Sequence, residues 1–226
     1  EVPGTTIDRQ CGSSQQAVHF AAQAVMSGTS DVIVAGGVQN MSLIPISSAM
    51  TLAQPMGFPD PFSGSTGWQK RYGTQEVSQF RSADMIAEKW SITRQDMEQF
   101  ALESHHRAIR ATDEGRFARE IVPYDGMTAD EGPRRDTSLE KMATLKTLRD
   151  NGRVTAAVSS QISDAAAALL IVSERALNQH HLKPRARIHH LSVRGADPVW
   201  MLTAPIPATA YALQRSGLSQ KDIDLI

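Results

Sequence analysis

The sequence predicts an α/β protein in which a helix crosses between parallel strands, and two observations point to this fold class. The first is a short β-like run at 5–7, followed by an amphipathic helix over 15–26 and a β-branched strand over 31–37. The second is a further apolar run, 165–173, with the composition of a buried strand. Because strand, helix and strand in succession form a βαβ unit, we expect a parallel sheet.

The helix over 15–26 is expected to bury one face and to end at Gly28. A glycine directly after the last turn is a common C-terminal cap, because it adopts the left-handed conformation without strain. The apolar residues that share the expected face are Ala17, Phe20, Ala21, Ala24 and Val25.

Residues 45–151 differ in character and predict a mostly helical insertion between the sheet elements. After an irregular stretch, a helix is expected over 74–90. A capping box of Thr93 and Asp96 then starts a charged helix that runs to Gly115. The prolines and glycines that mark the irregular stretch are Pro55, Gly57, Pro59, Pro61, Gly64 and Gly67.

Four further elements are expected from local pattern: helices over 138–144, 174–179 and 209–216, and a strand over 187–194. Residues 222–226 read as the opening of another strand. A strand at a chain end without a neighbour would be an exposed sheet edge, so we expect the sequence to be an internal portion of a longer protein.

The composition indicates an ordinary globular domain. Of the 226 residues, 41% are apolar and 21% charged, and the net charge of −1 argues against a nucleic-acid or anionic-membrane partner. The longest apolar run, 165–172, is too short to span a bilayer. A single cysteine can form neither an internal disulfide nor a cysteine-based metal site. We therefore expect a cytoplasmic protein without a bound metal.

That cysteine, Cys11, is the candidate nucleophile. It lies where the run at 5–7 turns into the helix, among backbone N–H groups that have no partner within the helix. Those groups favour thiolate over thiol and can hold an oxyanion beside the sulfur. The alternative is a buried structural cysteine, which is the commoner role of a lone cysteine.

A helix end contributes only about 0.3–1 kcal/mol, so Cys11 should also need a base. None of the seven histidines is well placed for this role. His19 lies two turns along the helix, and the others form the adjacent pairs 105–106, 180–181 and 189–190. We expect the base and a second acid/base group after Ile226, and the present span to be inactive by itself. A cysteine protease is disfavoured for the same reason.

Five short segments spread over the chain carry a family resemblance. They are 8–14 (Asp-Arg-Gln-Cys-Gly-Ser-Ser), 34–42, 130–134, 154–165 and 205–208. In this order they resemble the thiolases, the acyl-CoA C-acyltransferases that make or cleave 3-oxoacyl-CoA. Segments 71–73, 75–81 and 185–190 resemble, more narrowly, thiolases that shorten steroid side chains carried on CoA.

The resemblance implies a fold of two related αβα layers, with a mostly helical loop domain inserted in the first half and the second half incomplete here. It assigns residues 1–44 and 152–183 to the N-terminal core, 45–151 to the inserted loop domain, and 184–226 to the start of the C-terminal core.

The resemblance also implies site roles. Cys11 would attack the 3-keto carbon and carry the acyl group until free CoA collects it. Arg134 and Thr137 would lie near the nucleotide of CoA, where a surface arginine is the alternative reading of Arg134. Ser160 would lie near the pantetheine. Ala156 and Met201 would line the channel, with an apolar core role as an equal alternative. CoA is then a substrate and no cofactor is permanently bound. CoA and acyl-CoA esters are the partners, and a homodimer or homotetramer is implied.

Three departures from the family pattern concern the acyl pocket. The chain has Ser-Gln-Phe at 78–80 where many thiolases have His-Met-Gly, and Gln-Ile-Ser-Asp-Ala at 161–165 where many have Gly-x-Asn-Asp-Gly. Ala204 replaces a glycine. The first two changes disfavour a short acetoacetyl substrate and suit a bulkier acyl group. Two alternatives remain open: a condensing enzyme of the same superfamily, and a non-catalytic relative that binds acyl-CoA.

Overall fold

The computed structural model describes residues 1–60, 62 and 64–225, and these residues form two units. Unit 1 comprises Glu1–Leu52, Ile162–Gly195 and Pro205–Ile226, and unit 2 comprises Ala53–Gln161 and Ala196–Ala204. Pro61 of the predicted irregular stretch and Ile226 of the predicted last strand lie outside the described residues. The predicted division into four parts concerns the whole thiolase-like fold and stays a prediction.

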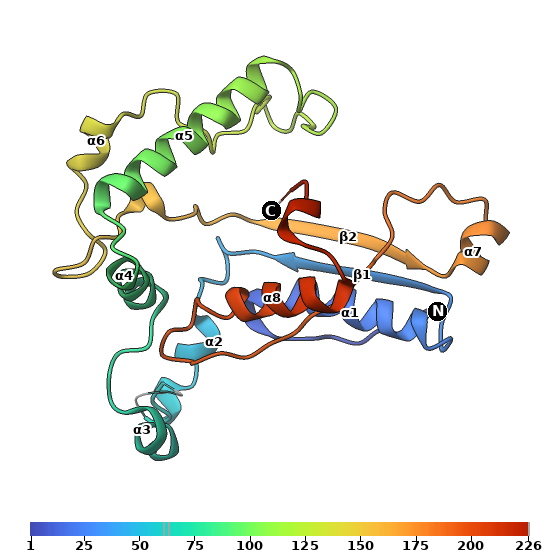
Figure 1. The fold of residues 1–226 in the computed structure, drawn as a ribbon, viewed down its shortest axis with the longest axis horizontal. Helices are drawn as coiled ribbons and strands as arrows, with labels where there is room; N and C mark the ends of the chain where they lie inside the picture. Colours follow the sequence, from blue (N-terminus) through green and yellow to red (C-terminus); the bar gives the residue numbers. More distant parts are fainter. Residues whose placement is uncertain (61, 63, 226) are drawn as a thin grey trace. The chain divides into compact units, whose positions relative to one another are not determined.

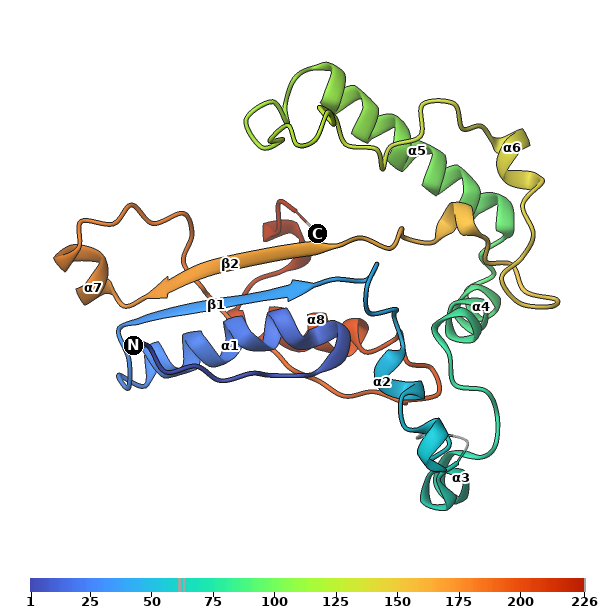
Figure 2. The same ribbon diagram turned by 180° about the vertical axis from the view of Figure 1, so that it is seen from behind.

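Two antiparallel strands form the centre of unit 1. Strand β1 (Val32–Gln39) pairs with β2 (Ala165–Val172), in a register that runs from Val32 opposite Val172 to Gln39 opposite Ala165 (Figures 1 and 2). Both strands lie where the sequence predicted them. The predicted parallel direction is wrong for this pair, and residues 5–7 do not form a strand. A long insertion joins β1 to β2, so local pattern does not determine their relative direction.

Helix α1 (Ser13–Met26) covers one face of the strand pair. Its buried Ala21 packs with Ala35 of β1 and Ile171 of β2, and partly buried apolar residues surround these three. The predicted role of Phe20 is wrong, because its side chain is 50% exposed. The buried stripe of α1 lies one position later than predicted and comprises Val18, Ala21, Ala22 and Val25.

The end of α1 is as predicted. Ser27 is the C-cap, and Gly28 follows it with φ +76°. The Gly28 N–H donates to the Val25 carbonyl at 3.1 Å, and the Thr29 N–H to the Ala24 carbonyl at 3.1 Å. Both bonds satisfy carbonyls that the helix leaves without a donor.

The opposite face of the strand pair is open. Val34, Val38 and Leu170 lie on it and are each more than half exposed. At one end of the pair, Asp164 joins the start of β2 to the chain after β1. Its carboxylate accepts the Ser42 N–H at 2.9 Å and also the Ser42 hydroxyl.

The remaining elements of unit 1 are short or lie near its ends. They are η1 (Gln10–Gly12), α2 (Ser48–Thr51), α7 (Glu174–Gln179), α8 (Pro205–Ser216) and η4 (Gln220–Asp222). Helix α7 has the predicted bounds, whereas α8 begins earlier than predicted and contains both prolines in its first turn, where proline is tolerated. The predicted strand over 187–194 is wrong. No strand partner pairs with these residues among those the structure describes.

Unit 2 is built from helices that begin at side-chain caps. They are η2 (Gln54–Met56), α3 (Thr66–Tyr72), α4 (Gln79–Lys89), α5 (Arg94–Asp113), α6 (Leu139–Ala143) and η3 (Ala156–Val158). The Thr93–Asp96 capping box of α5 is confirmed. The predicted start of α4 at residue 74 is wrong, because the Ser78 hydroxyl accepts the Arg81 N–H and starts the helix at Gln79.

Helix α3 lies inside the stretch that the sequence predicted to be irregular. The Ser65 hydroxyl caps it by accepting the Trp68 N–H at 3.2 Å. The Trp68 ring contacts the Phe62 ring at a centroid distance of 4.7 Å and the Tyr72 ring at 4.6 Å. These contacts stabilise a helix whose flanking glycines and prolines hide it from local pattern.

Arg94 joins α5 to the end of α6. Its Nη2 donates to three carbonyl oxygens, those of Met142, Ala143 and Leu145, at 2.9–3.1 Å. Its Nε donates to Glu98 at 2.7 Å, and the Glu98 side chain is buried. Met142 is buried beside this pair of helices. Among the helices that the structure describes, none has the length and apolar character that crossing a membrane requires.

Candidate active site

Cys11 lies in η1, one short turn before α1, as the sequence predicted. The turn is held by bonds close to the backbone: the Gln10 N–H donates to Asp8 Oδ1 at 2.8 Å, and the Gly12 N–H to the Arg9 carbonyl at 3.1 Å. The Ser13 hydroxyl donates to the Gln10 carbonyl at 2.7 Å and accepts the Arg9 N–H at 2.8 Å. Gln10 has φ +48°. This left-handed residue turns the chain directly before the cysteine.

The Cys11 thiol is free and exposed. It is therefore not sealed among packed side chains, as a structural cysteine would be. The N-cap of α1 is Gly12, which has no side chain to accept a backbone N–H, and no acidic residue lies in the first turn. The opening N–H groups of α1 therefore meet neither a capping side chain nor a neutralising carboxylate from that turn. They can favour a thiolate or an oxyanion at this end of the helix.

Arg9 adds a positive charge to the same turn. Its Nη1 donates to Gln16 Oε1 at 3.2 Å, and its guanidinium lies 3.6 Å from where a Cβ on Gly12 would be. Sequence reasoning noted Arg9 only as part of the motif. Its place two residues before the candidate nucleophile was the signal that could have singled it out.

His19 is not the base that Cys11 needs. It is 5% exposed, and no hydrogen bond to its Nδ1 is found within the described residues. Burial, and to a lesser degree the positive charge of Arg9, lower the pKa of His19 below its ordinary value. Within the described chain, no hydrogen bond joins the Cys11 sulfur to any histidine.

The five predicted CoA residues all belong to unit 2, whereas Cys11 belongs to unit 1. Arg134 is exposed, and its backbone N–H donates to His105 Nδ1 at 3.1 Å. The next residue, Arg135, forms a bidentate ion pair with Asp113 at 2.6 and 3.1 Å. Within the described residues no ion pair joins the Arg134 side chain. Its positive charge contributes to lowering the pKa of Asp136, after the larger effects of Lys141.

Thr137 is half-buried in the turn before α6. Ala156 and Ser160 lie in and after η3, and both are exposed. The apolar-core alternative for Ala156 is therefore wrong. Met201 is half-buried and has φ +44°, a conformation that a residue with a side chain seldom adopts.

Thr155 organises η3, although sequence reasoning gave it no role. It is fully buried, and its hydroxyl accepts the Ala157 N–H at 3.3 Å. Its carbonyl accepts the Ser159 hydroxyl at 3.0 Å and the Val158 N–H at 3.2 Å. These bonds fold the chain into a turn that leaves Ala156 and Ser160 at the surface. The motif 154–156 was the available signal.

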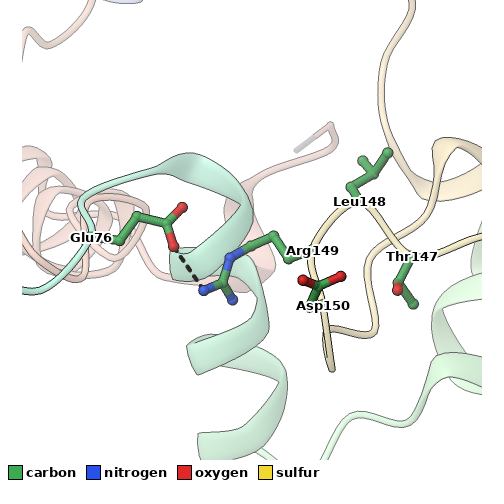
Figure 3. A pocket seen from close by; sticks show the side chains of 5 residues that line it. All are labelled: Glu76, Thr147, Leu148, Arg149 and Asp150. Carbon is green, nitrogen blue, oxygen red and sulfur yellow. Dashed lines mark hydrogen bonds and ion pairs between the residues drawn. The ribbon is translucent and has the colours of Figure 1, made fainter.

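Two hollows in unit 2 lie apart from the predicted residues. The first, of about 410 Å³, is polar and contains Arg149, whose Nη2 pairs with Glu76 at 2.8 Å (Figure 3). A hydrogen bond from Ser78, and then the bond from Arg149, lower the pKa of Glu76. The Arg149 cation is thus already neutralised by protein carboxylates. The other residues lining this hollow are Thr147, Leu148 and Asp150.

The second hollow, of about 470 Å³, is apolar and lies between α4, α5 and η3. Neither hollow includes Cys11. Among the residues that the structure describes, no group of three or more His, Cys, Asp or Glu side chains is placed to hold a metal ion. The residues lining the second hollow are Ala83, Ile92, Asp96, Met97, Phe100, Val154 and Val158.

Comparison with known proteins shows a consistent relationship. The sequence profile of the thiolase N-terminal domain matches residues 1–175. A steroid 3-ketoacyl-CoA thiolase of Mycobacterium tuberculosis is 59% identical over the whole chain, which covers 56% of that relative. A 3-ketoacyl-CoA thiolase of Shewanella loihica is 40% identical over 98% of the chain, which covers 57% of it.

A solved structure, that of an acetyl-CoA acetyltransferase from Syntrophomonas wolfei, matches 96% of the chain with a TM-score of 0.75 and 31% identity. The chain covers 57% of that structure. The present sequence thus spans little more than half the length of these relatives. The fold is the α/β fold of the thiolases, as the sequence predicted. The chain belongs to the thiolase family, and residues 1–175 match its N-terminal domain.

Proposed function

We propose that the full-length protein carrying this chain is a degradative thiolase with Cys11 as its nucleophile. The observation that carries the proposal is an exposed, free cysteine in the 8–14 motif, one turn before α1. An accessible sulfur beside unpaired helix N–H groups suits attack on a thioester-activated ketone.

The reaction has two steps. The Cys11 thiolate attacks the C3 keto carbon of a 3-oxoacyl-CoA, and the C2–C3 bond breaks. The electron pair of that bond stays on C2, which takes a proton and leaves as acetyl-CoA, or as propionyl-CoA from a 2-methyl substrate. The thiol of a second CoA then attacks the acyl-cysteine, releases the shortened acyl-CoA and returns the Cys11 thiol. CoA is thus a substrate and not a resident cofactor.

Both steps need acid/base groups, and His19 is unsuited to this role because it is buried with a lowered pKa. We place the catalytic base and the acid for the departing carbon in the part of the protein that matches the remaining length of the relatives. The chain of 226 residues is therefore expected to lack thiolysis by itself.

The CoA arm is assigned to unit 2. Arg134 is exposed and outside any ion pair of the described residues, so its guanidinium is available to a diphosphate. Thr137 offers a hydroxyl beside it, and Ser160 offers one to the amides of pantetheine. Exposed Ala156 and half-buried Met201 are assigned to the channel wall.

The substrate is assigned to the 3-oxoacyl-CoA esters of β-oxidation, with a bulky steroid side chain as the acyl group. The higher identity to the steroid 3-ketoacyl-CoA thiolase than to the acetyl-CoA acetyltransferase supports this choice. The departures at 78–80 and 161–165 support it as well. We also infer a homodimer or homotetramer from family habit, and a cytoplasmic location from the single free cysteine.

Kinetics of a Cys11→Ala variant test the mechanism in the full-length protein. Thiolysis should fall by at least about 10⁴-fold, because no other group can carry the acyl chain, while CoA binding should stay within about twofold. Thiolysis is followed by CoA-dependent loss of the 3-oxoacyl-CoA absorbance, and binding by calorimetry. Retained turnover in Cys11→Ala would contradict the mechanism, and preference for acetoacetyl-CoA over a steroid ester would contradict the substrate.

A further inference from the structure

Helix α4 reaches two separate segments of unit 2 through side-chain bonds to their backbones. Ser82 has no exposed surface, and its hydroxyl donates to the Val199 carbonyl at 3.1 Å. Asp84, one turn position further, accepts the Arg153 N–H at 2.8 Å and the Val154 N–H at 3.3 Å. It also accepts Arg149 Nη1 at 3.3 Å.

These two segments carry three of the residues assigned above to the CoA channel. Val199 precedes Met201 by two residues, and Val154 precedes Ala156 by two and Ser160 by six. We infer that Ser82 and Asp84 are positioning residues of the acyl-CoA channel, holding the 153–160 and 196–204 segments at the spacing the CoA arm requires. This inference rests on the proposed function.

The segment around Met201 needs such support because its backbone is strained. A residue with a side chain at φ +44° persists only where its surroundings hold it there. Asp197 holds the turn from within, since its Oδ1 accepts the Val199 N–H at 2.8 Å and its carbonyl accepts the Met201 N–H at 3.1 Å. Ser82 ties the same turn to α4.

Lys89, near the end of α4, makes a second link to this turn. Its Nζ lies 4.9 Å from the centroid of the Trp200 ring and 5.0 Å from that of Trp90. A cation between two aromatic faces attracts both. Helix α4 therefore contacts residues 199 and 200 at two points along its length, which fixes the turn more firmly than one bond would.

The link between Asp84 and the other segment depends on a close approach. A Cβ on Gly152 would lie 2.7 Å from Asp84 Oδ2 and 3.2 Å from the Arg149 carbonyl. Only glycine at residue 152 lets the carboxylate sit under the two N–H groups. Hydrogen bonds from N–H groups to a charged carboxylate are stronger than those to a neutral acceptor, so the contact is specific to aspartate.

The test compares kinetic constants of Asp84→Asn, Ser82→Ala and Gly152→Ala with those of the full-length wild-type enzyme. Each variant should raise the KM for both CoA and 3-oxoacyl-CoA by at least about fivefold, because a channel displaced by a fraction of an ångström binds the CoA arm less well. Each should leave kcat at saturation within about twofold. A merely structural role would lower the amount of active enzyme and leave KM unchanged.

Arg149→Met is the matched control, since it removes the ion pair of Asp84 but leaves the bonds to the 153 and 154 N–H groups in place. Its KM should stay within about twofold of wild type. Because KM does not depend on enzyme concentration, partial misfolding of a variant does not obscure the result. An unchanged KM in all three test variants, or an equal rise in Arg149→Met, would overturn the inference.

A wild-type enzyme without thiolysis would instead overturn the proposed function. In that event, calorimetric titration with CoA decides the positioning role alone. Weaker CoA binding by Asp84→Asn than by wild type supports it. Equal binding, or no binding by either, overturns it.

Discussion

At the scale of single residues, the account depends on the turn that presents Cys11. Gln10 adopts a left-handed conformation, and the Asp8 and Ser13 side chains bond to the backbone on either side of it. Sequence reasoning located the cysteine and the helix because both follow from local pattern. It could not foresee the strained Gln10, since nothing in a glutamine predicts positive φ.

His19 gives a prediction on pH. Its folded-state pKa is lowered by burial and, less, by Arg9, so the unfolded state binds a proton more readily than the folded state does. Stability is then fully present above the unfolded pKa near 6.5 and is lost as pH falls below it toward the folded value. Urea unfolding at pH 7 and pH 5 should show a smaller loss of stability in His19→Leu than in wild type.

His180→Leu is the control for this measurement, because His180 is exposed at the end of α7. Its loss of stability between pH 7 and pH 5 should match that of wild type. An equal loss in His19→Leu would show that the buried imidazole does not contribute to the acid sensitivity.

At the scale of elements, prediction succeeded where a helix carries its own signals. Helices α1, α5 and α7 were found because a cap, a capping box or a terminal glycine lies within each segment. Helix α3 was missed because its stability comes from stacked rings and a serine cap in a stretch rich in glycine and proline. The direction of β2 was missed because it depends on a partner far away in the sequence.

The junction of α5 and α6 provides a stability prediction. Glu98→Ala should lower the free energy of unfolding by about 3 kcal/mol, because it leaves Arg94 without its buried carboxylate while three carbonyls still hold the guanidinium in place. The exposed pair of Glu103 and Arg107 on the same helix has the same spacing and N–O distance of 2.7 Å. Glu103→Ala should cost less than about 1 kcal/mol.

Chemical denaturation of wild type and the two variants checks this difference. Equal destabilisation by Glu98→Ala and Glu103→Ala would show that burial of the Arg94–Glu98 pair adds nothing to the cohesion of unit 2.

At the scale of the whole molecule, the chain supplies a nucleophile in unit 1 and the candidate CoA residues in unit 2. The family and the candidate nucleophile could be predicted from short motifs, because a motif records chemistry that does not depend on distant contacts. The anchors on α4 could not be predicted, since Ser82 and Asp84 act on segments about 70 and 117 positions away in the sequence.

Residues 1–226 produced alone should show no measurable thiolysis, while the full-length protein is active. The reason is that no hydrogen bond within the described chain joins Cys11 to a histidine, and the buried His19 is held neutral. An assay of both proteins with the same 3-oxoacyl-CoA checks this. Turnover by the shorter chain would show that it contains its own base.

The most direct test of the central claim is to locate the acyl group in the full-length enzyme. The protein is incubated with a steroid 3-oxoacyl-CoA without free CoA, and intact mass and peptide mapping are recorded. We predict one added acyl group on Cys11, which disappears when CoA is added. An adduct on another residue, or turnover with no acyl group ever on Cys11, would contradict the account.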